Sequence, residues 1–116
     1  MKIRLDNQDS KIVKDNDTYR LIDNTELNNL VVSKTILHPG KCTTGHEHEG
    51  QEEVYQFTSG YGKMEVIPQR LEMDETFEVG PGDVVLIPDG HFHKVWNTSE
   101  TEDLIFVCVF DGKRNH

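Results

Sequence analysis

The side chains of this sequence best suited to chemistry are two histidines separated by one residue, a glutamate and a third histidine. His46 and His48 are two positions apart, and on a strand this spacing places both imidazoles on one face. Glu53 and Tyr55 share a face of a second expected strand, and His93 lies on a third. Three imidazoles and a carboxylate that converge inside a small domain are costly to bury unless something satisfies their polarity. A divalent transition metal would do so.

The elements that must position these residues are short strands. Helical periodicity is almost absent, and apolar runs recur about every ten residues between turn residues, which indicates an all-β sandwich or barrel. We expect strands at residues 31–37, 54–57, 63–67, 76–79, 84–87, 92–96 and 104–110.

Composition limits the partners. The 116 residues carry 21 Asp and Glu against 12 Lys and Arg, a net charge of −9, so we expect no general attraction for nucleic acid or membrane lipid. The longest apolar stretch, 104–110, is too short for a membrane-spanning helix. The first six residues become polar too early for a signal peptide, and Cys42 and Cys108 are isolated thiols. We therefore expect a cytoplasmic protein.

The size of the core favours one domain with outside support. Only 34% of the residues are hydrophobic, so a metal or a partner subunit is expected to supplement the packing. We expect a barrel over residues 31–110 and a polar C-terminal tail over 111–116. Residues 1–30 are expected to be an N-terminal extension with short strands, lying over the barrel or at a dimer interface. Open sheet edges pair readily, so we expect a homodimer.

Two spaced motifs carry a family resemblance. The first joins turn glycines to the His-x-His pair and a carboxylate: Gly40, His46, His48, Glu53 and Gly60. The second joins a turn to a histidine and an asparagine: Gly82, Pro88, Gly90, His93 and Asn97. In this order and at these spacings, the two motifs resemble the two signatures of the cupin superfamily.

The resemblance implies a double-stranded β-helix, the jelly-roll barrel, with a metal held inside one end. By matching positions, the metal ligands would be His46, His48, Glu53 and His93, and Asn97 would have a structural hydrogen-bonding role. Glu52 also fits the family's spacing after the His-x-His pair. Only one of two adjacent side chains on a strand can face inward, and Glu53 keeps the six-residue distance to Gly60, so we expect Glu53 to be the ligand.

The implied ligand set suits one divalent transition metal, namely Fe, Mn, Zn, Ni, Co or Cu. Four protein ligands on an octahedral ion leave two open positions, the layout of a catalyst or a ligand binder. The resemblance thus implies a small metalloenzyme, an isomerase, dioxygenase or lyase, acting on an oxygenated small metabolite such as a sugar or organic acid. The alternative is a non-catalytic, metal-dependent cupin that binds a small ligand or sugar.

Two residues are candidates for acid or base catalysis beside the metal. Tyr55 is expected on the inward face with Glu53, where its hydroxyl could act on a substrate; the other interpretation is a core aromatic residue. Glu52 is the second candidate, as a base next to the ligand. Lys and Arg are scattered near the motifs and form no cluster, which counts against a phosphorylated substrate.

Overall fold

The protein is an all-β domain in which the expected strands form. The computed structural model describes residues 1–6, 9–47, 50–68 and 76–112. Within these ranges it contains strands and no helix, so no described helix is long and apolar enough to cross a membrane. The strands are β1 (Lys11–Asp15), β2 (Tyr19–Asn24), β3 (Leu30–Leu37), β4 (Glu53–Ser59), β5 (Gly62–Pro68), β6 (Thr76–Val79), β7 (Val84–Ile87), β8 (His91–Asn97) and β9 (Leu104–Asp111).

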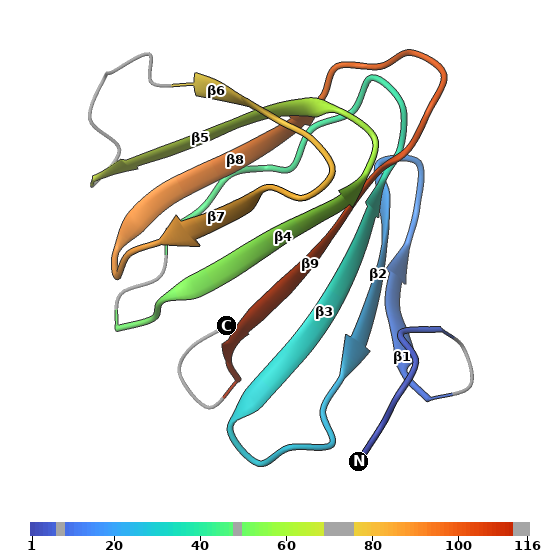
Figure 1. Ribbon diagram of the computed structural model, residues 1–116, viewed down its shortest axis with the longest axis vertical. Helices are drawn as coiled ribbons and strands as arrows, with labels where there is room; N and C mark the ends of the chain where they lie inside the picture. Colours follow the sequence, from blue (N-terminus) through green and yellow to red (C-terminus); the bar gives the residue numbers. More distant parts are fainter. Residues whose placement is uncertain (7–8, 48–49, 69–75, 113–116) are drawn as a thin grey trace.

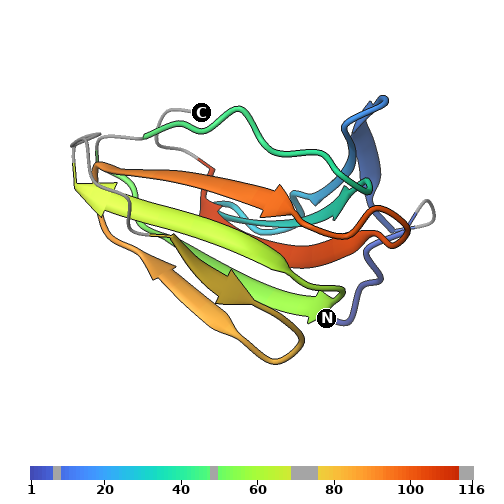
Figure 2. The same cartoon turned by 90° about the horizontal axis from the view of Figure 1, so that it is seen from above.

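Two antiparallel sheets make up the barrel. One has the strand order β1-β2-β3-β9-β4-β7 and the other has the order β6-β5-β8. Figure 1 shows the strands of the larger sheet fanning out side by side, and Figure 2 shows the smaller sheet stacked on it as a second layer. This is the jelly-roll arrangement expected from the sequence.

The segment before β3 contributes two strands, β1 and β2, to the larger sheet. β2 pairs with β3 along its full length, from Tyr19 opposite Leu37 to Asn24 opposite Val32, and β1 pairs with β2. The inward face of β2 therefore continues the inward face of β3 and β9. This continuity later determines which side chains line the cavity.

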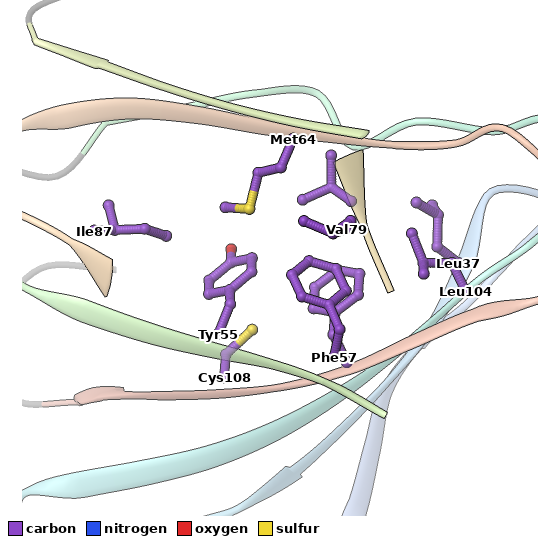
Figure 3. Close-up of a cluster of buried hydrophobic side chains, with 10 residues drawn as sticks. Leu37, Tyr55, Phe57, Met64, Val79, Ile87, Leu104 and Cys108 are labelled. Atoms are coloured by element: carbon purple, nitrogen blue, oxygen red, sulfur yellow. The ribbon is translucent and has the colours of Figure 1, made fainter. Parts of the chain in front are cut away.

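Strict alternation along β4 separates the core from the surface. Glu53, Tyr55 and Phe57 are buried, whereas Val54 and Gln56 between them are exposed. Figure 3 shows side chains of the larger sheet pointing toward side chains of the smaller sheet. The buried cluster that joins the sheets comprises Leu37, Tyr55, Phe57, Met64, Val79, Ile87, Val95, Leu104, Phe106 and Cys108.

Two motif residues have structural roles at the end of the barrel. Gly60 has a φ of +84°, and a Cβ at this position would collide with the carbonyl oxygen of Asp103, so only glycine is accommodated without strain. Asn97 is buried, and its side-chain amide donates to the carbonyls of Leu37 at 2.9 Å and Glu102 at 2.8 Å. The structural role expected for Asn97 is confirmed.

Replacing Asn97 with alanine should destabilise the barrel strongly. The substitution leaves two carbonyl oxygens without their amide donor, one of them in a buried contact, and a lost partner of this kind costs about 1–3 kcal/mol. We expect the free energy of unfolding of N97A, measured by urea denaturation, to fall by about 2–3 kcal/mol. Asn28→Ala, at an exposed position, is the matched control and should change stability by less than about 0.5 kcal/mol. An equal effect of both substitutions would contradict the assigned role.

Candidate metal centre

The two sequence motifs meet at a backbone pair between His46 and His93. The N–H of His46 donates to the carbonyl of His93 at 3.1 Å, and the N–H of His93 donates to the carbonyl of His46 at 3.0 Å. Residues paired in this way on antiparallel chains carry their side chains on the same face. The two imidazole rings accordingly meet edge to face, with centroids 4.4 Å apart.

Gly45 allows the segment before His46 to lie close to β8. Its φ is +76°, and a Cβ at this position would come within 2.6 Å of the Phe92 ring. Either feature would strain any other residue. A second contact holds the same segment against β8: the N–H of Thr43 donates to the carbonyl of Val95 at 2.9 Å.

Glu53 completes a compact group of potential metal ligands. Its Oε2 lies 3.0 Å from Nε2 of His93, and both side chains are almost fully buried. One ligand atom each from His46, Glu53 and His93 lies within 4.8 Å of the other two. His46 is exposed, whereas Glu53 and His93 are buried. The group therefore has a buried end and a solvent-accessible end.

The donor types suit a transition metal, and the distances between the donor atoms need to shorten only slightly for all three to bind one ion. Bonds from zinc-like ions to histidine nitrogen and carboxylate oxygen are about 2.0–2.2 Å, which places donors around one ion about 3–4.4 Å apart. Two imidazoles and a carboxylate are also ligands that such ions accept. His48, expected as the fourth ligand, lies outside the described residues, so its role stays a prediction.

The structure distinguishes the two adjacent glutamates. Glu53 faces inward beside His93, and Glu52 is exposed. Glu52 instead borders a surface hollow together with Val54 and Asp89. The structure therefore does not bring Glu52 to the His46–Glu53–His93 group, because adjacent side chains at the start of a strand point to opposite faces.

Tyr55 lies where it was expected, next to the ligand group. Its ring centroid is 5.6 Å from that of His93, and the ring stacks on Phe106 at 5.2 Å. Burial raises the pKa of Tyr55 well above its ordinary value, and the neighbouring Cys108 and Glu53 raise it further. The hydroxyl is therefore protonated at neutral pH and can donate a hydrogen bond. Figure 3 shows it pointing toward Met64 of the opposite sheet.

Cys108 is an inert thiol next to this group. Burial is the main cause that raises its pKa well above the ordinary value, and Glu53 adds to the effect. A buried, protonated thiol of this kind is a poor nucleophile. Both Cys108 and Cys42 are free cysteines, as expected from the sequence.

A cavity of about 190 Å³ opens beside the ligand group. His46 and Glu53 form part of its wall. The rest of the wall comes from β2, β3, β9, residues 43–44 of the segment beside β8, and β4: Tyr19, Leu21, Asp23, Ser33, Thr35, Thr43, Thr44, Tyr55, Phe106, Cys108 and Phe110. Its volume is below the roughly 300–1,000 Å³ of pockets for drug-sized ligands, which suits a small metabolite.

One polar wall of this cavity was not predicted from the sequence. Ser33 donates to Oδ1 of Asp23 at 2.6 Å, and Thr35 lies two positions further along β3. The available signal was the alternation within residues 31–37, which places Ser33, Thr35 and Leu37 on one buried face. Asp23 gave no signal of its own, because the inward face of β2 depends on its pairing with β3.

The fold and the site define a jelly-roll protein with a candidate metal centre inside one end of the barrel. The sequence model of the family described as Cupin domain matches residues 33–110. This chain belongs to the cupin family.

Relatives with assigned names are enzymes of two kinds. The chain is 36% identical over 92 residues to a probable oxalate decarboxylase of Arthroderma benhamiae, which covers 74% of this chain and 22% of that protein. It is 29% identical over 108 residues to a glucose-6-phosphate isomerase of Thermococcus kodakarensis, covering 86% of this chain and 56% of that one. The chain thus spans about a fifth of the decarboxylase and just over half of the isomerase.

A solved structure of similar size has the same fold. The crystal structure of a predicted oxalate decarboxylase from Thermotoga maritima superposes with a TM-score of 0.72 at 21% sequence identity. The match covers 96% of this chain and 98% of that one. At this identity the likeness shows the shared jelly-roll fold.

Glu53→Gln should lose metal, whereas Glu52→Gln should retain it. In E53Q a neutral amide replaces the carboxylate of the group, while E52Q changes an exposed side chain and should alter stability by no more than about 0.5 kcal/mol. The measurement is bound metal per chain by elemental analysis after equal dialysis of the two variants and the wild type. Loss of metal from E52Q with retention by E53Q would mean that the strand is shifted by one residue.

Proposed function

We propose that this cupin binds one divalent transition metal and acts as a small metalloenzyme on an oxygenated small metabolite. The ligands are His46, Glu53 and His93, with His48 as the fourth. One observation carries the proposal: the three donor side chains converge, and two of them, His46 and Glu53, also line a small cavity. A metal that only stabilised the fold would need no such opening.

The residues of the chain would divide the work at this site. The bound metal would act as a Lewis acid that holds and polarises substrate oxygens. Glu53 and His93 form the buried end of the site, while His46 lies at its exposed side. Tyr55 would offer its protonated hydroxyl as a hydrogen-bond donor. The apolar rings of Phe110, opposite Glu53, and Phe106, stacked on Tyr55, would exclude water beside the ligand group.

Isomerase or lyase chemistry is favoured among the reaction types. The relatives named above are a decarboxylase and an isomerase, and both reactions rearrange or cleave bonds next to oxygen atoms that a metal can hold. Dioxygenase chemistry has no comparable support from these relatives. The native metal is proposed only as a divalent transition ion.

Turnover distinguishes an enzyme from a binding protein. Protein loaded separately with Mn²⁺, Fe²⁺ or Zn²⁺ is incubated with a mixture of small sugars and organic acids, and the mixture is followed by mass spectrometry and NMR. We expect the loaded wild type to consume or isomerise a component, and E53Q to leave it unchanged. Ligand-dependent stabilisation without any conversion would favour the non-catalytic binding cupin.

Removing the metal should lower thermal stability. Ligand linkage gives about 3–4 kcal/mol at free metal concentrations 100 to 1,000 times the dissociation constant. We expect the melting temperature to fall after complete chelation and to recover when metal is added back. Bound metal should also decrease as the pH is lowered toward about 6, where free imidazole begins to protonate. An unchanged melting temperature after chelation would contradict an occupied site.

The homodimer expected from the sequence stays a prediction, and an exposed apolar surface supports it. Val54, Val84 and Leu86 are exposed on the outer side of β4 and β7, where Val54 is directly opposite Leu86. We expect light scattering to give about twice the chain mass of 13.3 kDa at micromolar concentration. A mass near that of one chain would refute the dimer.

A further inference from the structure

The strand register aligns a row of polar side chains along one wall of the cavity. Asp23 on β2 is opposite Ser33 on β3, Ser33 is opposite Cys108 on β9, and Cys108 is opposite Tyr55 on β4. All four residues line the cavity. Cross-strand neighbours of this kind share a face of the sheet, so the row leads from the candidate metal centre to the carboxylate of Asp23.

The described lining of this cavity has carboxylates, hydroxyl groups and the imidazole of His46 but no Lys or Arg. The lining residues with carboxylates are Asp23 and Glu53, and those with hydroxyl groups, besides Tyr55 whose hydroxyl points toward Met64, are Tyr19, Ser33, Thr35, Thr43 and Thr44. On the strands that line the cavity, Arg20 and Lys34 alternate onto the opposite face of the sheet. Arg20 is engaged there with Asp15 at 3.5 Å. Lys14 of β1 is exposed and lies outside the lining, with its ammonium 5.9 Å from the centroid of the Tyr19 ring.

The charges of the site decide which ligands it can accept. With the divalent metal of the proposed function in place, the two carboxylates balance its two positive charges, because the imidazole ligands are neutral. An uncharged ligand keeps this balance. A dicarboxylate such as oxalate adds two negative charges to a partly closed site whose described lining contains no Lys or Arg to pair with them, which is unfavourable.

Asp23 is placed to select for hydroxyl groups. Ser33 donates one hydrogen bond to Oδ1 of Asp23, and a carboxylate has about four acceptor sites, so acceptor capacity remains for a ligand. A ligand hydroxyl can donate to a carboxylate, whereas a carboxylate ligand has no proton to donate. The neighbouring threonine hydroxyls can both donate and accept, which suits a ligand with several hydroxyl groups.

Building on the metal site of the proposed function, we infer that the cavity binds an uncharged, polyhydroxylated small molecule of the sugar or polyol class. One end of the ligand lies at the candidate metal centre, and the other donates a hydrogen bond to Asp23. The same wall discriminates against dicarboxylates. This chain then differs in substrate class from a decarboxylase of oxalate, although its sequence resembles one.

The test compares neutral, anionic and cationic probes on wild type and on Asp23→Asn. Zn²⁺-loaded protein is titrated calorimetrically with erythritol, xylose and fructose, and separately with oxalate, malonate and ethanolamine. Zinc has no redox chemistry, and metal per chain is measured before and after each titration to exclude stripping by oxalate. Asp17→Asn is the matched control, since it removes the same charge from an exposed turn outside the cavity.

We expect at least one neutral probe to bind the loaded wild type at least tenfold more tightly than oxalate does. D23N keeps the acceptor for Ser33 but loses the charge-assisted hydrogen bond, so its affinity for the neutral probe should fall about tenfold. Its affinity for oxalate should rise, because one negative charge is gone. D17N should match wild type for every probe, and D23N should retain its metal because Asp23 is not a ligand.

The outcomes separate this inference from the proposed function. A wild type that retains no metal would overturn both. A metal-loaded wild type that prefers oxalate or ethanolamine, or binds no neutral probe, would overturn the inference alone, and this comparison needs no variant. An unchanged ratio of neutral to oxalate affinity in D23N, with folding verified by circular dichroism, would also overturn it.

Discussion

The reciprocal hydrogen bonds between His46 and His93 are the contact on which the site depends. They connect β8 with the segment between β3 and β4, and so bring together residues that lie far apart in the chain. An antiparallel pair of this type fixes both the spacing and the direction of its two side chains. Glu53 approaches from the larger sheet, so the ligand group bridges the two sheets of the barrel. Any shift of either sheet would separate the donors.

Burial of Glu53 and His93 imposes a cost that the fold must offset. A buried carboxylate is unfavourable unless it is paired, and its attraction to a neighbouring imidazole compensates only in part. The surrounding core is built to hold these groups in place: Tyr55 packs against both His93 and Phe106. A metal bound at such a site would require little reorganisation of its buried side, which favours a precise ligand geometry over adaptability.

Much of the barrel could be predicted because strand alternation and turn residues are local signals. The strands expected between residues 31 and 110 all form, with ends that differ by at most two residues. Glu53 faces inward for the same local reason, since Tyr55 and Phe57 share its face. The motif spacing predicted that His46 and His93 would meet, but only through resemblance to a family. No local signal in the sequence states which strands pair.

The polar wall could not be predicted, because it depends on pairing between strands rather than on any one strand. Asp23 lies in a segment rich in Asp and Asn whose inward face is fixed only when β2 pairs with β3. Ser33 and Thr35 were visible in the sequence, yet they acquire meaning only from the carboxylate opposite them. The candidate metal ligands all belong to the two motifs, whereas this wall comes from strands outside them or at their margin. With the role inferred for Asp23, a change in β2 or β3 would alter which small molecule binds without altering the candidate metal ligands. The register of these two strands determines which of their side chains line the cavity.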